Sequence, residues 1–361
     1  MPRRVLVAMS GGVDSSVAAL LVAREPGVEA VGAMMRFWHG PGENQMSACC
    51  SPDAAHAARR AADRIGIPFY VLDFREPFER HIRADFIAEY AAGRTPNPCV
   101  RCNREVKFGA LLERARAMGF DAVATGHYAV LKDGAAGREV HRSADAAKDQ
   151  TYFLWGLRRE LLPQVEFPVG SLTKSQVREV AREAGLANAD RPESQEICFV
   201  PGSTAEYLDA RLGERPGPIV DTSGRRLGEH AGTHHFTVGQ RKGLGLAGGP
   251  WFVVRIDAPG RTVVVGHREE CASDTAEADA ASFLAPPPEL PRRVLAQVRH
   301  RQPPAPAALE SSGDAFRLRF DEPQFAVTPG QSVVLYSGSR LLGGGIAASP
   351  VGLRSLPLAM A

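Results

Sequence analysis

The sequence predicts an α/β protein with an N-terminal doubly wound parallel sheet, a small β-rich central domain and a C-terminal β-barrel. In the first half of the chain, apolar runs of strand length alternate with helical stretches, which is typical of a parallel sheet with helices on both faces. After about Pro201 the apolar runs become short and are separated by turn residues, as in all-β domains. The chain has 361 residues, too many for one ordinary core. We therefore expect domains at 1–204, 205–280 and 281–361.

The expected elements of the N-terminal domain alternate from the first residues onward. They are a strand at 3–9, a helix at 13–25, a strand at 28–35, a helix at 53–66, a strand at 67–74, a helix at 106–119, a strand at 120–129 and a helix at 172–186. The second helix has a favourable start, because Ser51 suits the cap, Pro52 the first turn and Asp53 the positive end of the dipole. The last helix is capped by Thr173 or Ser175. Ligands of such sheets bind beyond the carboxyl ends of the strands.

The last third of the chain has the pattern of short antiparallel strands. Strand–turn–strand patterns cover 217–228, 250–266 and 331–347, with glycine-containing turns. Residues 283–293, with four prolines, are typical of a stiff linker. The segment 315–320 alternates apolar and charged residues, as a half-buried strand does. The same alternation would place Arg299 and Arg301 on one strand face.

Composition and charge limit the class of protein. The 43 basic and 41 acidic residues give a net charge of +2, which neither requires nor excludes a nucleic-acid partner with a local basic face. No apolar run approaches the roughly 18–20 residues that span a bilayer, so we expect no membrane partner. The N-terminal apolar run is too short for a secretion signal. The sparse cysteines then predict a reducing, cytoplasmic location; they are Cys49, Cys50, Cys99, Cys102, Cys198 and Cys271.

The segment AMSGGVDSS, residues 8–16, follows the first strand and opens the first helix. Its adjacent glycines let the backbone approach a ligand closely, and the unpaired N–H groups of a helix start bind anions. The segment lacks the lysine of a P-loop and the three glycines of a dinucleotide fingerprint. We therefore expect a pyrophosphate cradle for adenylation, with Asp14 holding Mg²⁺ against the phosphates. The alternative is a plain strand-to-helix turn in which serine and aspartate act as caps.

The segment NPCVRCN, residues 97–103, holds a Cys-x-x-Cys pair. In a reducing compartment such a pair binds a metal, cycles as a dithiol or carries sulfur to a substrate. The pair alone does not decide among these roles. The remaining cysteines Cys49, Cys50 and Cys271 are assigned to packing, whereas Cys198 lies in a segment with its own pattern.

Six segments together resemble one family. SGGVDS is similar to the loop of the ATP-pyrophosphatases, which share a HUP-like adenine nucleotide alpha hydrolase fold. The other segments resemble the tRNA-specific 2-thiouridylases, in order and spacing over nearly the whole chain. They are GRTPNPCVRCNREVKF (93–108), ATGHYA (124–129), KDQTYFL (148–154), SQEICFV (194–200) and HHFTVGQRKGLG (234–245). Some members of that family have aspartate where this chain has Cys99.

The resemblance implies a function and a set of site residues. It implies a tRNA-uridine 2-sulfurtransferase that uses ATP and Mg²⁺, binds the anticodon loop of tRNA, and receives sulfur from a persulfide donor protein such as a cysteine desulfurase or relay. The implied catalytic residues are Cys102 as nucleophile and Cys198 as persulfide carrier. The implied ATP-binding residues are Ala8, Met9, Ser10, Gly11, Gly12, Val13, Asp14, Ser15, Met35 and Gly126. The implied target-base contacts are Asn97, Pro98 and Cys99, and the implied tRNA contacts are His127, Lys148, Asp149, Gln150, Arg299, His300 and Gln331.

The chemistry of this reaction explains the need for two cysteines. Adenylation turns O2 of the uracil into a leaving group, and a persulfide is a better nucleophile at neutral pH than a thiol whose pKa is about 8.5. Release of the terminal sulfur requires a second cysteine and leaves a disulfide. We expect Cys198 to carry the persulfide and Cys102 to take its inner sulfur. Attack on C2 either by freed sulfide or by the persulfide itself fits these residues.

Other interpretations stay open. An iron–sulfur cluster on Cys99, Cys102 and Cys198 is an alternative carrier of sulfur. Zinc on the same thiols lacks an obvious fourth ligand. A non-catalytic nucleotide-binding module would explain the loop and the cysteine pair, but not Cys198. Another amidotransferase-like synthetase would need a glutaminase segment, and none is evident in the sequence.

Overall fold

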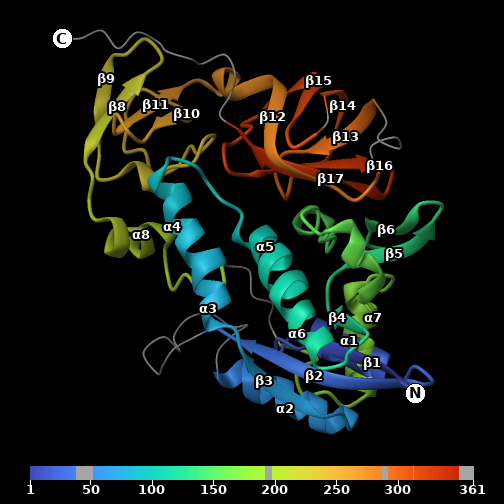
Figure 1. The fold of residues 1–361 in the computed structure, drawn as a ribbon. Helices are drawn as coiled ribbons and strands as arrows, with labels where there is room; N and C mark the ends of the chain where they lie inside the picture. The colour runs from blue at the N-terminus through green and yellow to red at the C-terminus, as the bar shows by residue number, and fades with distance from the viewer. Residues whose placement is uncertain (38–51, 192–196, 287–291, 312, 349–361) are drawn as a thin grey trace.

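A computed structural model describes residues 1–37, 52–191, 197–286, 292–311 and 313–348. Its N-terminal domain is built on a five-stranded parallel sheet in the order β3-β2-β1-β4-β7 (Figure 1). The strands are β1 (Arg3–Ala8), β2 (Val28–Arg36), β3 (Phe69–Asp73), β4 (Ala122–Thr125) and β7 (Val165–Glu166). The strand order reverses between β1 and β4, and ligands of doubly wound sheets bind at such a point. The predicted fold class is confirmed.

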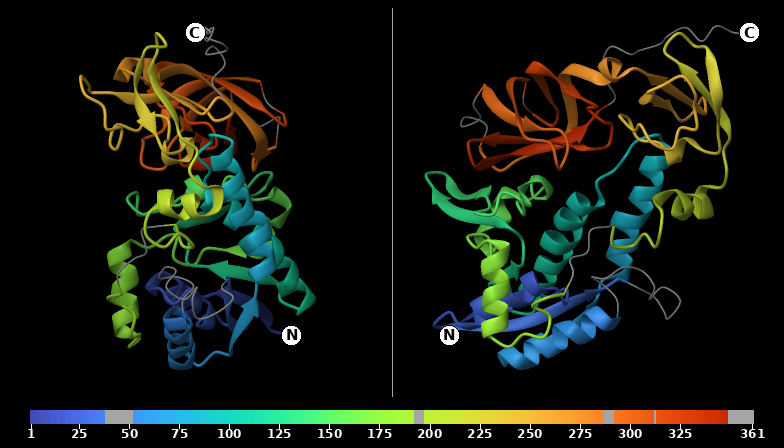
Figure 2. Two further views of the ribbon diagram at one scale, coloured as in Figure 1. Left: turned by 90° about the vertical axis from the view of Figure 1, so that its left-hand side faces the viewer. Right: turned by 180° about the vertical axis from the view of Figure 1, so that it is seen from behind.

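Helices cover both faces of this sheet (Figures 1 and 2). One face packs against α1 (Val13–Ala23), α2 (Pro52–Ile65) and α7 (Lys174–Glu183). The other face packs against two longer helical segments and α8 (Thr204–Leu212). The first segment joins α3 (Arg75–Phe78), the π-helix η2 (Glu79–Arg83) and α4 (Ala84–Ala91). The second joins α5 (Pro98–Arg101), the π-helix η3 (Cys102–Ala110) and α6 (Leu111–Ala117).

Two of the elements predicted for the N-terminal domain differ from the structure by more than three residues. The helix expected at 106–119 begins at Pro98, because the proline suits a first helical turn and the chain continues through the π-helix η3. The strand expected at 120–129 is divided into β4 and β5, since the chain leaves the parallel sheet after Thr125. The Ser51 cap, the cysteines Cys49 and Cys50, and residues 287–291 of the linker expected at 283–293 lie outside the described residues.

The hairpin of β5 (Ala129–Gly134) and β6 (Gly137–Arg142) joins the N-terminal domain to the barrel. Its second strand pairs with the barrel strand β17 at Arg340 and His141. A shared apolar core lies beneath this contact; it includes Tyr152 and Trp155 from the N-terminal domain and Tyr336 from the barrel. The short 3-10 helices η4 (Thr151–Phe153) and η5 (Arg159–Gln164) belong to this region. The N-terminal domain and the barrel therefore share a core.

The central domain is a small four-stranded sheet in the order β10-β11-β8-β9. Its elements are β8 (Gly217–Asp221), β9 (Arg226–His230), the 3-10 helix η6 (Thr233–His235), β10 (Phe252–Asp257), β11 (Thr262–Gly266) and the 3-10 helix η7 (Arg268–Cys271). The two strand–turn–strand predictions at 217–228 and 250–266 are confirmed. The domain start expected at 205 falls within α8, whose Tyr207 and Leu208 belong to the N-terminal core.

The C-terminal domain is a closed six-stranded barrel, because β12 pairs with both β15 and β17. Its strands are β12 (Ala272–Phe283), β13 (Arg293–Gln297), β14 (Ala305–Ser311), β15 (Phe316–Phe325), β16 (Ser332–Ser337) and β17 (Arg340–Ala347). Alternate residues of β15 are buried, as predicted. The domain start expected at 281 falls inside β12. No helix among the described residues is long and apolar enough to cross a membrane.

Candidate active site

The loop between β1 and α1 forms a tight backbone turn at the carboxyl edge of the sheet. Gly11 has φ of +78°, and a Cβ there would lie 2.3 Å from the carbonyl oxygen of Ala54 in α2. Only glycine fits this position without strain. Gly12 is the N-cap of α1, with φ of −83° and no side-chain capping bond. The first N–H groups of α1 are consequently left for a ligand, which is the arrangement of an anion site.

Serine hydroxyls hold the shape of this loop from within. The backbone N–H of Ser10 donates to Ser15 Oγ at 3.1 Å. The hydroxyls of Ser15 and Ser16 donate to the carbonyl oxygen of Gly12 at 3.0 and 3.1 Å. Ser15 and Ser16 are buried, whereas Ser10 is exposed. The Ser10 hydroxyl is therefore the one best placed to meet a ligand.

Asp14 in the first turn of α1 forms an ion pair that the sequence did not predict. Lys174 Nζ lies 2.7 and 2.8 Å from the two carboxylate oxygens of Asp14, and the hydroxyl of Tyr128 donates to Oδ1 at 2.7 Å. The Lys174 side chain is only 11 % exposed. Lys174 thus brings a buried positive charge to a loop that lacks a P-loop lysine. The donor set around Asp14 does not fit Mg²⁺ in this arrangement, because an ammonium group already contacts both oxygens.

The position of Lys174 carries a signal that sequence reasoning overlooked. Lys174 is the first residue of α7, after the N-cap Thr173, one of the two predicted caps, which forms a capping box with Gln176. A cation is unfavourable at the positive end of a helix dipole. A lysine there indicates that a nearby negative charge outweighs the dipole.

Asn188 is a second loop contact that sequence reasoning missed. Its amide Nδ2 donates to the carbonyl oxygen of Gly11 at 3.0 Å and to Ser16 Oγ at 2.9 Å. Its Oδ1 is buried and has no hydrogen-bond partner among the residues that the structure describes. Asn188 lines a cavity of about 520 Å³ beside the loop, together with polar and charged side chains that include His56, Arg60 and Arg191. No sequence signal connects Asn188 with a loop 177 residues earlier.

The other residues predicted to bind ATP lie around the same edge of the sheet. Met9 and Val13 are buried in the core beneath the loop, on the face covered by α1. A Cβ at Gly126 would lie 2.6 Å from the backbone nitrogen of Ser15. The end of β4 therefore packs directly on the first turn of α1. Met35, at the end of β2, is half-buried against the opposite core.

The Cys-x-x-Cys pair lies in the first turns of the helix that begins at Pro98. Asn97 is its N-cap residue and makes no side-chain capping bond. Cys99 is exposed and Cys102 is half-buried, and residues three apart lie on the same face of a helix. The π-helix η3 begins at Cys102, and π-helical segments are frequent at functional sites. The exposed Cys99 and half-buried Asn97 and Cys102 fit contact with a ligand.

The second predicted catalytic cysteine packs against the same core as the first. Cys102 and Cys198, both half-buried, contact the apolar cluster between the sheet and α4, η3 and α8. Ala8 at the end of β1 and Met35 at the end of β2 contact this cluster too. The two cysteines, 96 positions apart in the chain, therefore pack against the same core as the strand ends at the carboxyl edge of the sheet, where the nucleotide is predicted to bind.

A small cavity of about 170 Å³ separates the cysteine helix from the barrel. Asn97 and Arg101 line it from the helix, and Trp155 and Ser332 line it from the shared core and the barrel. Gln331 Nε2 donates to the carbonyl oxygen of Thr95 at 2.9 Å. The barrel thus fixes the segment that leads into Asn97.

Several residues predicted to contact tRNA make contacts within the protein. His127 is 8 % exposed, and its Nδ1 lies 2.7 Å from Thr125 Oγ1. Asp149 accepts hydrogen bonds from Ser143 N and Thr151 Oγ1. Gln150 Oε1 accepts one from Tyr128 N at 2.9 Å. Lys148 precedes them in a turn closed by its N–H and the carbonyl oxygen of Asp145. The expected tRNA contacts of these residues stay predictions.

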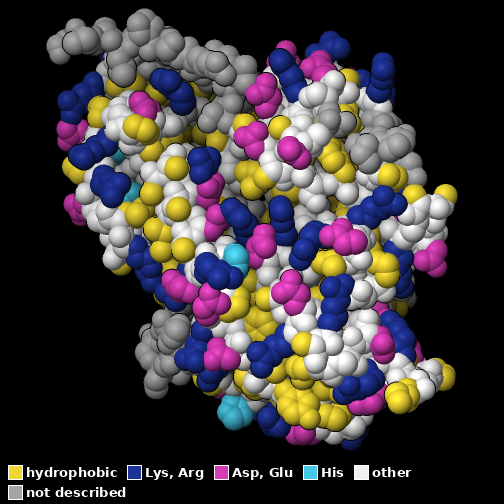
Figure 3. All heavy atoms as spheres, in the orientation of Figure 1, with side chains coloured by type: hydrophobic (Ala, Val, Ile, Leu, Met, Phe, Trp, Pro, Cys, Tyr) yellow, Lys and Arg dark blue, Asp and Glu magenta, His cyan; other side chains and the backbone are white. Residues whose placement is uncertain are grey.

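The basic residues near the start of the barrel show a similar outcome. Arg299 Nη2 donates to the carbonyl oxygen of Val238 and to Thr328 Oγ1, the latter at 2.7 Å. Arg299 and Arg301 follow the end of β13, so the prediction that they share a strand face is wrong. His300 is exposed, and its ring packs against Phe153. Figure 3 shows Lys and Arg side chains spread among Asp and Glu side chains on one face of the molecule.

Comparisons with known proteins cover nearly the whole described chain. Family models match residues 3–202 (tRNA methyl transferase HUP domain), 205–267 (tRNA methyl transferase PRC-barrel domain) and 273–347 (aminomethyltransferase beta-barrel domain). The chain is 54 % identical over 355 residues to the tRNA-specific 2-thiouridylase MnmA of Thermus thermophilus, covering 95 % of this chain and 94 % of that protein. It is 51 % identical over 360 residues to the protein of the same name from Deinococcus radiodurans, covering 98 % and 94 %.

Proposed function

Because the chain belongs to the family of tRNA-specific 2-thiouridylases, we propose that it replaces O2 of the wobble uridine of tRNA with sulfur in an ATP-dependent reaction. One observation carries this proposal. Cys102 and Cys198 pack against the same core as Ala8 and Met35, which end the strands at the nucleotide edge. Two thiols that share a core with the strand ends at this edge fit a sulfur transfer to a carbonyl activated there.

The first step is adenylation. O2 of the uracil attacks the α-phosphorus of ATP, the bond from that phosphorus to the bridging oxygen breaks, and pyrophosphate leaves with the negative charge. The N–H groups at the start of α1 and the hydroxyl of Ser10 would bind the phosphates. Lys174, held at the loop by Asp14, would stabilise the charge that develops on pyrophosphate. No step requires a residue to transfer the γ-phosphate, in agreement with the missing P-loop lysine.

The second step transfers sulfur. A persulfide on Cys198, supplied by a donor protein, attacks C2 with its terminal sulfur, and AMP leaves with the former O2. The thiolate of Cys102 then attacks the inner sulfur of Cys198, which breaks the S–S bond, leaves 2-thiouridine and forms a Cys102–Cys198 disulfide. Attack of Cys102 before transfer, which frees sulfide, gives the same products. In both orders an external thiol reductant supplies two electrons to restore the cysteines.

The target base has to leave the anticodon stack to reach these groups, at a cost of about a few kcal/mol. Asn97 is the N-cap residue of the helix that carries Cys102. It is half-buried, and its side chain makes no capping hydrogen bond. Its amide offers both a donor and an acceptor to the Watson–Crick edge of uracil. Pro98 is buried beneath it, which fixes the direction of the helix start. We therefore assign Asn97 to recognition of the flipped base.

Substitution of the two cysteines tests the proposal. We expect Cys198→Ser and Cys102→Ser to abolish 2-thiouridine in tRNA while leaving tRNA-dependent release of pyrophosphate in place. The matched control is Cys271→Ser, because Cys271 is buried in the central domain region and donates to the carbonyl oxygen of Val253. Nucleoside mass analysis and a pyrophosphate assay give the two readouts. Thiolation that persists in Cys198→Ser would overturn the relay.

An iron–sulfur cluster is the alternative sulfur carrier, and the exposed Cys99 keeps it under consideration. The thiolates of Cys99, Cys102 and Cys198 suit three irons of a cluster, whose fourth iron would supply bound sulfide. Cys99→Ser separates the two routes, since the persulfide relay does not use Cys99. Retained thiolation favours the relay, and loss of both thiolation and the visible absorption of anaerobically purified protein favours the cluster. Pyrophosphate release that depends on tRNA excludes a non-catalytic module.

A further inference from the structure

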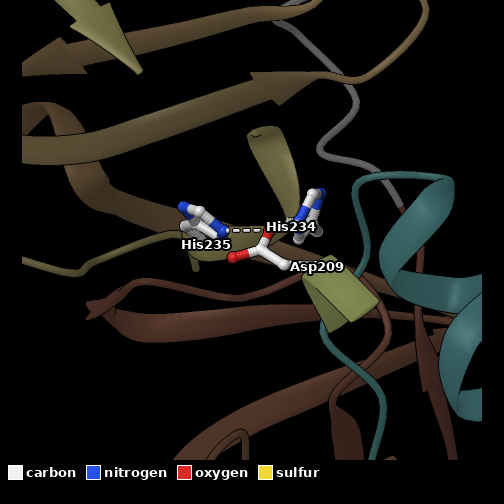
Figure 4. A group of neighbouring side chains, drawn as sticks. All are labelled: Asp209, His234 and His235. Atoms are coloured by element: carbon white, nitrogen blue, oxygen red, sulfur yellow. Dashed lines mark hydrogen bonds and ion pairs between the residues drawn. The ribbon is translucent and has the colours of Figure 1, made fainter. Parts of the chain in front are cut away.

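A group of metal-ligating side chains lies away from the candidate active site, where α8 meets the central domain. Asp209 belongs to α8, and His234 and His235 form part of the 3-10 helix η6. One ligand atom from each residue lies within 4.8 Å of the other two. Figure 4 shows the two imidazole rings on either side of the carboxylate, directed toward it. None of the three residues takes part in the chemistry proposed above.

The two distances between the imidazole nitrogens and the carboxylate oxygen are slightly shorter than those between ligand atoms around a bound zinc ion. His234 Nε2 and His235 Nε2 lie 2.7 and 2.8 Å from the same oxygen, Asp209 Oδ1. Ligand atoms around a tetrahedral zinc ion, with metal–ligand distances of about 2.0–2.1 Å, lie roughly 3.3 Å apart. Each of these two distances would have to grow by about half an ångström to admit the ion, and the ligand atoms of the three residues all lie within 4.8 Å of one another.

We propose that Asp209, His234 and His235 bind a divalent transition-metal ion, with zinc as the expected occupant. Two imidazoles and one carboxylate favour zinc and its neighbours in the first transition row over Mg²⁺ or Ca²⁺, which prefer oxygen ligands. The side chain of His234 is 2 % exposed, whereas those of His235 and Asp209 are 22 % and 34 % exposed. The exposed side leaves room for a water molecule as the fourth ligand.

The ligands connect two separate cores, so the ion would act as a clasp. Tyr207 and Leu208, which precede Asp209 in α8, are buried in the core of the N-terminal domain. Phe236, which follows His235, is buried in the core of the central domain. An ion held by both elements fixes the position of the central domain relative to the sheet. The clasp does not depend on the proposed thiolation.

The same atoms form a hydrogen-bonded group when no ion is bound. Each imidazole then donates its Nε2–H to Asp209 Oδ1. In the metal-bound form each neutral imidazole carries its proton on Nδ1, so that the Nε2 lone pair faces the ion, and Asp209 stays ionised. The two forms therefore differ in the tautomer of two histidines and in one bound ion, and they can be separated by measuring metal.

Zinc titration of the full-length chain tests the proposal. We expect wild-type protein to bind one more zinc ion per chain than the variants Asp209→Asn and His235→Gln. Added zinc should also raise the melting temperature of the wild type but not that of either variant. The matched control is His141→Gln, because His141 contacts one carboxylate, that of Glu139, at 2.9 Å. Thiol sites are common to all four proteins, so they cancel from the comparison. Equal zinc stoichiometry in wild type and in the two cluster variants overturns the proposal.

A second variant keeps the test decisive when a ligand substitution weakens folding. His235→Cys retains three ligands and should bind the same number of cobalt ions as wild type. It should add a sulfur-to-cobalt charge-transfer band beyond that of the native thiols, because the new thiolate is itself a metal ligand. An unchanged cobalt spectrum in this variant, with folding verified by circular dichroism, contradicts a metal site at these residues.

Discussion

At the loop between β1 and α1, polar side chains converge on one short stretch of backbone, whereas around the barrel they are spread over separate internal hydrogen bonds. Asn188 contacts the loop at Gly11, and Lys174 contacts it through Asp14. Around the barrel, Arg299 contacts Val238 in the segment before β10, and Gln331 contacts Thr95 in the segment before the cysteine helix. The difference is one of arrangement, because long-range polar contacts meet at a single loop in the first region and connect the barrel to separate segments in the second.

The largest expected effect is at Lys174, where substitution breaks the convergence at the loop. Lys174→Met should lower kcat/KM for thiolation by at least about a hundredfold, because an electrostatic partner of the leaving pyrophosphate is lost. The unfolding free energy should fall by about 3 kcal/mol, since Asp14 keeps a partly buried charge without its cation. Steady-state kinetics and urea unfolding measure the two effects. Lys174→Arg keeps the charge and should recover part of both; equal activity in Lys174→Met and wild type would refute this role.

A substitution at Gly11 tests the shape of the loop rather than its charge. Gly11→Ala should lower the unfolding free energy by roughly 2–3 kcal/mol, because the residue has φ of +78° and its Cβ would contact the carbonyl oxygen of Ala54. The control is Gly12→Ala, which has φ of −83° and a nearest contact of 3.6 Å. The control should cost at most about 1 kcal/mol, as expected for an N-cap change. Chemical denaturation compares them, and equal losses would contradict the steric argument.

The third prediction concerns Arg299 and distinguishes a structural hydrogen bond within the protein from a contact with tRNA. Arg299→Ala should lower the unfolding free energy by about 1–3 kcal/mol, because Val238 and Thr328 lose a buried donor. The salt dependence of tRNA affinity should stay unchanged. The control is Arg301→Ala at an exposed neighbouring position, which should leave stability unchanged. A decrease of about one in the slope of log affinity against log salt for Arg299→Ala would instead indicate a phosphate contact.

The smallest effect at neutral pH is expected at His127. Burial lowers the pKa of His127 well below its usual range, and the charge of Lys107 lowers it further. The folded protein therefore binds fewer protons than the unfolded chain, whose histidine has a pKa of about 6.5. Stability from this residue is complete above about pH 6.5 and decreases below it, by at most about 1.4 kcal/mol per pH unit.

His127→Gln tests this pH dependence. The variant should unfold with a shallower loss of stability between pH 6.5 and pH 5, and urea unfolding at several pH values measures the slope. We expect the side-chain amide of the glutamine to keep the contact that His127 makes with Thr125 Oγ1. Parallel pH profiles for variant and wild type would show that His127 is accessible to protons in the folded state, as a residue that contacts tRNA would be.

Local patterns in the sequence predicted most of the fold. Buried strands, helix starts and hairpins are encoded by residues that are close in the chain, and β1, α1 and α7 lie near their predicted bounds. The segment that forms α3, η2 and α4 was missed, although Phe78, Ile82, Phe86 and Tyr90 recur every four residues and are all buried. That spacing is a helical signal.

The site was predictable only in part, for a physical reason. The loop is a local feature, so its glycines and Asp14 could be identified from the sequence. Lys174 and Asn188 reach it from 160 and 172 or more residues away, and nothing local specifies such contacts. Whether a polar residue faces a ligand or an interior partner depends on the same long-range packing, as Arg299 and Gln331 illustrate.

The pairing of β6 with β17 constrains the order in which parts of this chain can fold during synthesis. His141 and Ser339, which contact each other across this junction, are 198 residues apart in the chain. Synthesis starts at the N-terminus, so the edge of the hairpin and the ring of Trp155 stay uncovered until β16 and β17 have been made. A chain that stops before β16 and β17 would leave this aromatic surface uncovered, and we expect it to be more susceptible to proteolysis than the chain that contains both strands.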